Sequence, residues 1–183
     1  MDQVAEHPAH LLYVLRHAKS SWKEPGQQDY ERALAPRGRK AARLISRHLE
    51  QAGVRPALVL CSPARRARET YEGVAPSGEL VLERELYGAG ADGLLERLRE
   101  VPEAVDSVMV IGHNPGLQEL VLLLAQPRRA QLAETAHSAS ALRRVREKFP
   151  TCALATLCLR CRWRELRPGR AELQTLVAPA DLA

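Results

Sequence analysis

The sequence predicts a three-layer α/β domain, an αβα sandwich built around a mostly parallel central sheet. Short apolar runs alternate with longer segments whose apolar residues recur at helical spacing, which is typical of successive βα units. The 183 residues contain no internal repeat and no linker that would divide them, and this length suits one domain with a substantial core. We therefore expect a single domain over residues 11–183, preceded by a short N-terminal extension over residues 1–10.

The first half of the chain is expected to contain two strands and the helices that follow them. Apolar runs indicate strands over about 11–16 and 57–61. Between them a helix is expected from Pro36, because proline suits the first turn, to Gly53, which is typical of a helix end. Ser62-Pro63 favours an N-cap and first turn for a second helix.

The second half is expected to continue this alternation until two consecutive strands close the sheet. The elements predicted there are a strand near 80–82, a helix over 91–101, a strand over 107–111, a helix from Pro115 to about Ala125, and strands over 153–161 and 171–177. Residues 127–147 are basic and rich in alanine, and their periodicity is too indistinct to choose between a helix and irregular structure.

The composition narrows the classes of partner. The net charge is +5, but the 23 arginines and 4 lysines are interleaved with acidic residues, and no aromatic side chains alternate with them to stack on bases. We expect no nucleic-acid partner, since a positive field would equally suit a phosphorylated substrate. The apolar runs are too short to cross a bilayer and the amino terminus shows no secretory signal, so we expect a cytoplasmic protein without a membrane partner.

The four cysteines do not form a convincing metal site. Cys158 and Cys161 have C-x-x-C spacing, but they lie in a predicted strand, where positions i and i+3 point to opposite faces. Cys61 and Cys152 supply no second pair of ligands. We expect no metal and interpret the cysteines as small core residues of a reducing compartment.

Three predicted strand ends carry matching polar chemistry. Arg16 and His17 end the first strand, Arg66 lies in the first turn after the second, and His113 follows the apolar strand over 107–111. Carboxyl ends of parallel strands meet at one edge, where ligands bind in open α/β sheets. Arginine holds phosphate oxygens through its planar fork, and a neutral imidazole is a competent nucleophile. These residues therefore predict a phosphate pocket with His17 as nucleophile.

A phosphoryl-transfer site of this kind also needs a proton donor for the leaving group. Glu85, at the end of the strand near 80–82, is the best-placed carboxylate in the sequence. An exposed turn glutamate without a catalytic role is an equally good interpretation of this residue.

Taken in order, these segments resemble the histidine phosphatase superfamily, which has the phosphoglycerate-mutase-like fold, and especially its small SixA-type phosphohistidine phosphatases. The resemblance spans about residues 11–180. The segments that carry it are Leu15-Arg16-His17-Ala18-Lys19-Ser20-Ser21-Trp22, Arg32-Ala33-Leu34-Ala35-Pro36-Arg37-Gly38, Ser62-Pro63-Ala64-Arg65-Arg66-Ala67-Arg68-Glu69-Thr70, Glu85-Leu86-Tyr87 and Ile111-Gly112-His113-Asn114-Pro115-Gly116. Ala33 stands where a proline is common in the family, and Cys152 where a glycine is common.

The resemblance implies a role for each site residue. His17 would take the phosphoryl group as a phosphohistidine, which water then hydrolyses. Arg16, Arg66 and His113 would form the phosphate pocket, and Glu85 matches the usual position of the acid. The loop that often borders the pocket would contribute Lys19 and Arg32 to substrate binding. The resemblance implies no cofactor and no metal.

The number of residues between the predicted site residues indicates how open the pocket is, and therefore which class of substrate it suits. Glu85 and His113 are separated by 28 positions, which one helix and one strand fill, so there is no room for a capping subdomain. An open pocket suits a phosphoryl group on a protein surface, and the labile P–N bond makes phosphohistidine plausible. We therefore expect a phosphohistidine-bearing protein as substrate, with a phosphatase for small phosphate esters as the alternative.

Two further alternatives remain. A cysteine-based phosphatase using Cys61 would need an arginine six positions later, where Ala67 stands. A phosphate-recognition module without turnover would need only the cations, so the presence of His17 and His113 argues against it.

Overall fold

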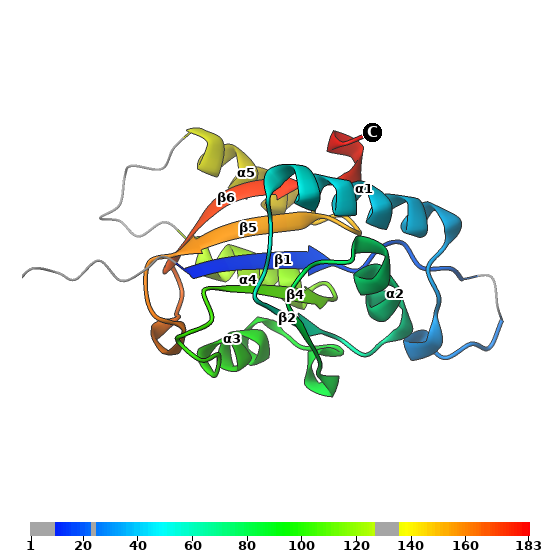
Figure 1. The fold of residues 1–183 in the computed structure, drawn as a ribbon, viewed down its shortest axis with the longest axis horizontal. Coiled ribbons are helices and arrows are strands. Elements are labelled where there is room, and N and C mark those ends of the chain that lie inside the picture. The colour runs from blue at the N-terminus through cyan, green and yellow to red at the C-terminus, as the bar shows by residue number, and fades with distance from the viewer. Residues whose placement is uncertain (1–9, 23–24, 127–135) are drawn as a thin grey trace, which may run out of the picture.

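The computed structural model describes residues 10–22, 25–126 and 136–183, which form a six-stranded sheet with helices on both faces (Figure 1). The strands are β1 (His10–Arg16), β2 (Leu58–Cys61), β3 (Glu79–Leu82), β4 (Ser107–Gly112), β5 (Leu154–Leu159) and β6 (Ala171–Val177). The α-helices are α1 (Pro36–Ala52), α2 (Arg65–Val74), α3 (Ala91–Arg99), α4 (Gly116–Leu124) and α5 (Ala136–Glu147).

The order of strands in the sheet is β3-β2-β4-β1-β5-β6. The four strands from β3 to β1 are parallel to one another, whereas β5 is antiparallel to both β1 and β6. The expected fold class, a three-layer sandwich around a mostly parallel sheet, is therefore confirmed. Between β3 and β4 the described chain contains only a 3-10 turn, η2 (Arg84–Leu86), and α3.

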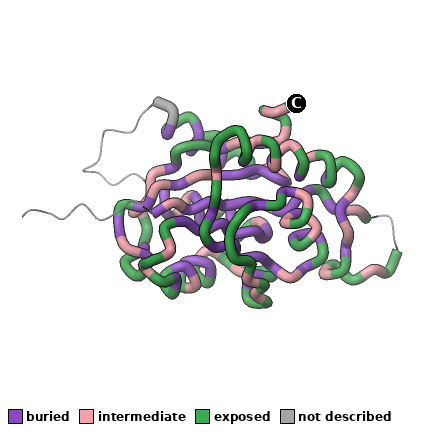
Figure 2. The backbone as a smooth tube through the Cα atoms, in the orientation of Figure 1, coloured by how far each residue is buried: buried purple, intermediate pink, exposed green. Residues whose placement is uncertain are grey.

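Alternation along the buried strands divides the core into two layers. Leu12 and Val14 of β1 pack in the cluster that includes residues of α3, α4 and α5, whereas Tyr13 and Leu15 pack in the cluster with α1 and α2. Successive side chains of a strand point to opposite faces, so β1 contributes to both layers. Figure 2 shows the buried strands at the centre of the molecule, covered by helices that are exposed on their outer sides.

Helix α1 has the boundaries that the sequence predicts. Pro36 is its first residue, and Gly53 ends it in the left-handed conformation with φ of 65°. Its buried face is made by Ala42, Ile45 and Leu49, which are spaced three or four residues apart and pack on the sheet side of the helix. The remaining predicted strands and helices also lie within a few residues of their expected bounds.

One expectation about helices needs revision, and one open assignment is resolved over its described part. Ser62 is not a helix N-cap: α2 begins at Arg65, and its N-cap is Ala64. The chain takes two extra residues to turn from the end of β2 into α2, and the Ser62 side chain is used elsewhere. The undecided segment 127–147 is helical over α5, while its residues 127–135 lie outside the described residues.

Among the residues that the structure describes, no helix is both long enough and apolar enough to cross a membrane.

The close approach of Gly38 fixes α1 against the chain that leaves β1. A Cβ atom at Gly38 would lie 2.2 Å from the backbone oxygen of Lys19. That oxygen also accepts a hydrogen bond from the backbone N–H of Ala35, at 2.8 Å. Since neither partner is a flexible side chain, a larger residue at position 38 would push the helix away from the segment that follows His17.

We expect Gly38→Ala to lower the free energy of unfolding by about 2 kcal/mol, because overpacking against fixed backbone typically costs 1–3 kcal/mol. The matched control is Gly93→Ala in α3, where a Cβ atom would meet nothing within 4 Å. That variant should be more stable than the wild type by up to about 1 kcal/mol, since alanine favours the helix. Urea denaturation of both variants checks this, and equal stabilities would contradict the proposed contact.

Candidate active site

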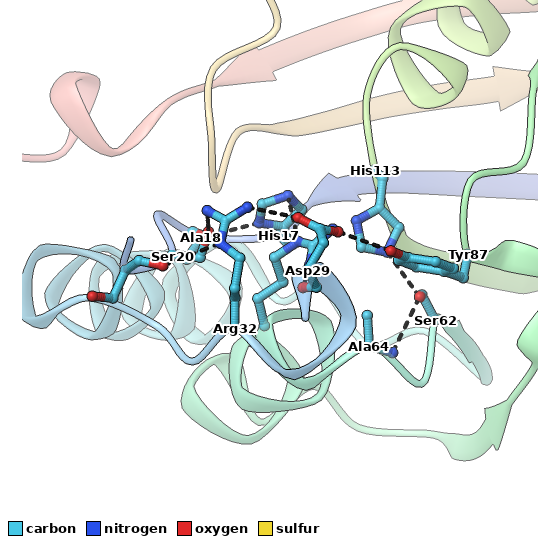
Figure 3. Close-up of polar contacts among 11 residues, drawn as sticks. His17, Ala18, Ser20, Asp29, Arg32, Ser62, Ala64, Tyr87 and His113 are labelled. Atoms are coloured by element: carbon cyan, nitrogen blue, oxygen red, sulfur yellow. Dashed lines mark hydrogen bonds and ion pairs between the residues drawn. The ribbon is translucent and has the colours of Figure 1, made fainter. Parts of the chain in front are cut away.

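The parallel pairing of β1 with β4 brings two histidines together. Arg16 is in register with Gly112, and the backbone N–H of His17 donates to the carbonyl oxygen of Gly112 at 3.0 Å. His17 and His113 are therefore the first residues beyond two adjacent strands that end at the same level. Their ring centroids are 5.1 Å apart, and both residues are buried (Figure 3).

Helix α2 delivers Arg66 to the same place. Its side chain is buried, and Nε donates to Nε2 of His17 at 3.3 Å. Thr70, one turn further along α2, fixes the helix to the chain after β1: its hydroxyl donates to the Arg66 carbonyl at 2.6 Å and accepts from the backbone N–H of Ala18 at 2.9 Å. The position of Arg66 relative to His17 is thus set by backbone contacts as well as by its own side chain.

His17 is held in the tautomer that leaves Nε2 free of hydrogen. Its Nδ1 lies 2.8 Å from the carbonyl oxygen of Ala18, which can only accept, so Nδ1 carries the proton. The pKa of His17 is lowered to about 3, mainly by burial and in part by the nearby His113, Arg66 and Arg16, against the effect of the Ala18 hydrogen bond. The imidazole is therefore neutral at physiological pH, with the lone pair of Nε2 directed to the Arg66 side.

His113 is neutral for similar reasons. Burial, followed by the charge of Arg66, lowers its pKa to about 4. Its Nε2 lies 2.8 Å from Oγ of Ser62, and that oxygen accepts a weak bond of 3.4 Å from the backbone N–H of Ala64. Nδ1 of His113 is buried and has no hydrogen-bond partner among the described residues. Ser62 thus orients this imidazole instead of capping α2.

Arg16 is anchored from the opposite side of the site. Its Nη1 donates to the carbonyl oxygen of Phe149 at 2.7 Å, and burial lowers its pKa from the usual value. The backbone N–H of Cys152 contacts the carbonyl oxygens of Arg16 and His17 at 3.0 and 3.2 Å. Cys152 has a φ of 62°, a conformation in which glycine is unstrained. The segment before β5 therefore supports the end of β1.

Asp29 is a site residue that the sequence reasoning missed. It opens a 3-10 turn, η1 (Asp29–Glu31), and its Oδ2 accepts from Nη2 of Arg66 at 2.9 Å and from the hydroxyl of Tyr87 at 2.8 Å. Its Oδ1 accepts from Nη1 of Arg32 at 2.7 Å. An acidic residue three positions before Arg32 in a polar loop carries no pattern that would have identified it.

Tyr87 belongs to one of the segments that resemble the family, and the structure places it beside His113. Its ring packs edge-on against His113, with centroids 5.5 Å apart, and against Tyr30 at 5.1 Å. The exposed fraction of Tyr87 is 38%, so an aromatic surface borders the pocket on its solvent side. Its position two residues after Glu85 was the sequence signal that could have identified Tyr87 as a site residue.

The remaining predicted site residues make no hydrogen bond or ion pair with the two histidines or with Arg16 and Arg66 among the described residues. Glu85 lies in η2 and is exposed. Lys19 is also exposed, and its backbone oxygen accepts a hydrogen bond from the backbone N–H of Ala35. Arg32 is buried, but it contacts Asp29 and the 20–22 segment, so it reaches the pocket only through the Asp29 carboxylate.

The arrangement presents cationic and neutral donors around one potential nucleophile. Arg66 donates to Nε2 of His17, and Arg16 and the ring of His113 lie near the same imidazole, which suits a tetrahedral oxyanion. Among the described residues no group of three or more histidine, cysteine or acidic side chains is placed to hold a metal ion. Cys61 is fully buried, and burial raises the pKa of its thiol to about 12, so the Cys61 alternative has neither access nor a thiolate.

Comparison with known proteins agrees with this geometry. The family model of the histidine phosphatase superfamily (branch 1) matches residues 12–87. An uncharacterized protein of Mycobacterium tuberculosis is 33% identical over 159 residues, which cover 87% of this chain and 96% of that protein.

Solved structures show the same likeness over nearly the whole chain. A protein from Nakamurella, named as a candidate phosphohistidine phosphatase SixA, has a TM-score of 0.80 at 30% identity, covering 93% of this chain and 96% of its own. A second candidate SixA, from Agrobacterium tumefaciens, has a TM-score of 0.71 at 30% identity, covering 93% and 98%. With its paired histidines and arginines at the ends of parallel strands, this chain belongs to the histidine phosphatase superfamily.

Proposed function

We propose that this protein is a phosphatase that uses His17 as its nucleophile and removes phosphate from phosphohistidine on a protein. One observation carries the mechanism: Nε2 of His17 is unprotonated, because Nδ1 donates to Ala18, and it lies 3.3 Å from the guanidinium of Arg66. A phosphoryl group held by Arg66 would be in contact with this lone pair. Membership of the superfamily supports phosphatase activity of some kind on phosphorylated substrates.

The reaction proceeds in two displacements at phosphorus. Nε2 of His17 forms a bond to phosphorus while the bond to the leaving group breaks, and the leaving nitrogen or oxygen takes up a proton. Since Nδ1 keeps its own proton, the phosphorylated imidazole is cationic and becomes a good leaving group. Water then attacks phosphorus, loses a proton, and breaks the P–Nε2 bond, which releases inorganic phosphate and restores neutral His17.

Arg16, Arg66 and His113 neutralise the charge on the phosphoryl oxygens during both steps. Most of the rate enhancement in phosphoryl transfer comes from such positioning and charge stabilisation. An approaching phosphate dianion would raise the pKa of His113 from about 4, which favours a charged donor at this position when substrate is bound.

A phosphohistidine substrate is favoured by the leaving group that the site can serve. Imidazole is a far better leaving group than an alkoxide, so the reaction needs little help from an acid. Glu85 is exposed and makes no hydrogen bond to either histidine in the described structure. The two candidate SixA proteins at 30% identity support the same choice. A phosphatase for small phosphate esters on the same scaffold is the second candidate, and it would depend on a proton donor such as Glu85.

We expect His17→Ala to abolish both turnover and the formation of an acid-labile phosphoenzyme, because no other neutral imidazole in the site has its nitrogen against Arg66. Rapid quenching with a 32P-labelled phosphohistidine protein, followed by alkaline gel electrophoresis, measures both. His48→Ala in α1 is the control and should behave as wild type. Persistence of the labelled intermediate in His17→Ala would refute the assignment of the nucleophile.

We expect Glu85→Gln to reduce hydrolysis of small phosphate esters by about tenfold or more, since general acid catalysis contributes on the order of 10²–10⁴-fold. Hydrolysis of phosphohistidine should change less than threefold. Initial rates with a phosphohistidine-bearing protein, phosphoserine peptides and sugar phosphates test the two substrate classes on the same variant. Equal losses on both classes would show that the P–N bond also needs this carboxyl group.

We expect the imidazole resonances of His17 and His113 not to titrate between pH 8 and 5, because their pKa values are lowered to about 3 and about 4. The unfolded chain binds these protons near pH 6.5, so both groups stabilise the folded state above that pH, and stability falls as pH drops from 6.5 toward 4. Two-dimensional NMR of 15N-labelled histidine reports both nitrogens. A midpoint near 6.5 for either ring would contradict its burial as a neutral group.

A further inference from the structure

The guanidinium of Arg66 already holds a carboxylate in the free protein. Its Nε donates to His17, while Nη1 donates to the backbone oxygen of Asp29 at 2.6 Å and Nη2 to its Oδ2 at 2.9 Å. These bonds use three of the five N–H groups of the guanidinium. A phosphoryl oxygen that takes the N–H now donated to Oδ2 must compete with the Asp29 carboxylate for it.

The surroundings of the Asp29 carboxylate are those of a bound anion. Oδ2 accepts from Arg66 and from the Tyr87 hydroxyl, and Oδ1 accepts from Arg32 (Figure 3). Burial by itself would raise the pKa of Asp29, but the hydrogen bonds from Arg32, Tyr87 and Arg66 hold it at about 2. The carboxylate is thus charged at every pH at which the protein would work.

We propose that Asp29 is an internal competitor of the phosphoryl group: its carboxylate occupies Arg66 in the free protein, yields to the substrate, and returns to help expel inorganic phosphate. This role rests on the proposed function, since it assigns Arg66 to the phosphate pocket. Its consequence is a weak affinity for the product. Each binding event exchanges one anion on Arg66 for another. Only the difference between their free energies of interaction with Arg66 therefore contributes to the affinity for phosphate.

Arg32 provides the place to which the carboxylate retreats. Its Nε donates to the carbonyl oxygen of Ser21 at 3.1 Å and its Nη2 to Oγ of Ser20 at 2.5 Å, and its guanidinium lies 3.2 Å from the centre of the Trp22 ring. These contacts do not involve Asp29 or Arg66, so Arg32 stays in position when phosphate enters. The Asp29 side chain is 45% exposed, which leaves room for Oδ2 to turn away while Oδ1 keeps its bond to Arg32.

Binding of inorganic phosphate to the full chain at pH 8, measured by isothermal titration calorimetry, tests this role without requiring turnover. Asp29→Asn should bind phosphate about tenfold or more tightly than wild type, because a charge-assisted bond is removed only from the free state. Asp29→Ala should show the same direction. The inhibition constant of phosphate in the hydrolysis assay should fall by a similar factor.

Two control variants separate competition from a general effect of charge. Glu31→Gln removes a carboxylate from the same turn, and Asp181→Asn removes one that is 40% exposed and paired with Arg144 at 2.7 Å on the far helix α5. Neither carboxylate contacts Arg66 in the described structure, so each should change phosphate affinity less than threefold. If Glu31→Gln tightens binding as much as Asp29→Asn, long-range charge explains the effect and the proposal is wrong.

Tyr87→Phe supplies an independent variant. It removes one hydrogen bond to Oδ2 of Asp29, so it should loosen the competitor and tighten phosphate binding in the wild-type background but not in Asp29→Asn. If Asp29 serves only to position Arg66, its removal would instead weaken phosphate binding, and this result overturns the proposal. Absence of phosphate binding in every variant would overturn the phosphate pocket itself. A phosphate affinity that Asp29→Asn leaves unchanged would overturn only the proposed role of Asp29 as a competitor.

Discussion

The parallel pairing of β1 with β4 is the constraint on which the site depends. Because Arg16 is in register with Gly112, the residues that follow each strand, His17 and His113, leave the sheet side by side. The hydrogen bond from His17 N–H to the Gly112 carbonyl continues the ladder for one residue beyond β1, so the backbone of His17 is held by the sheet. A shift of one residue would send His17 to the opposite face.

The charges around this point explain the protonation states of the site. Two arginines and little solvent make a protonated imidazole unfavourable, so both histidines are neutral until an anion arrives. The carboxylate of Asp29 offsets the charge of Arg66 in the meantime. An unpaired buried guanidinium is costly, and an internal anion that is easily displaced stabilises the free protein without closing the pocket. The same interaction thus connects the stability of the free state with the affinity for phosphate.

Local features account for what could be predicted about the fold. Strand β1 and helix α1 follow the expected bounds because a short apolar run, a first-turn proline and a terminal glycine act within a few residues. Ser62 shows where this reasoning fails: Ser-Pro suits an N-cap, but the hydroxyl contacts His113, which is distant in sequence, and α2 starts later. The tertiary hydrogen bond with His113 therefore outweighed the local preference of Ser62 for an N-cap position.

The sequence by itself determined the layer architecture and the strand ends near which Arg16, His17, Arg66 and His113 lie. This was possible because hydrophobic periodicity and turn preferences depend on residues that are close together in the chain. Only the tertiary structure decided which tautomer His17 adopts and that the Ser62 hydroxyl contacts His113. It also decided that the carboxylate bound to Arg66 is that of Asp29 and not that of Glu85. These depend on distances between segments far apart in the chain, and no local pattern in a single sequence encodes such distances.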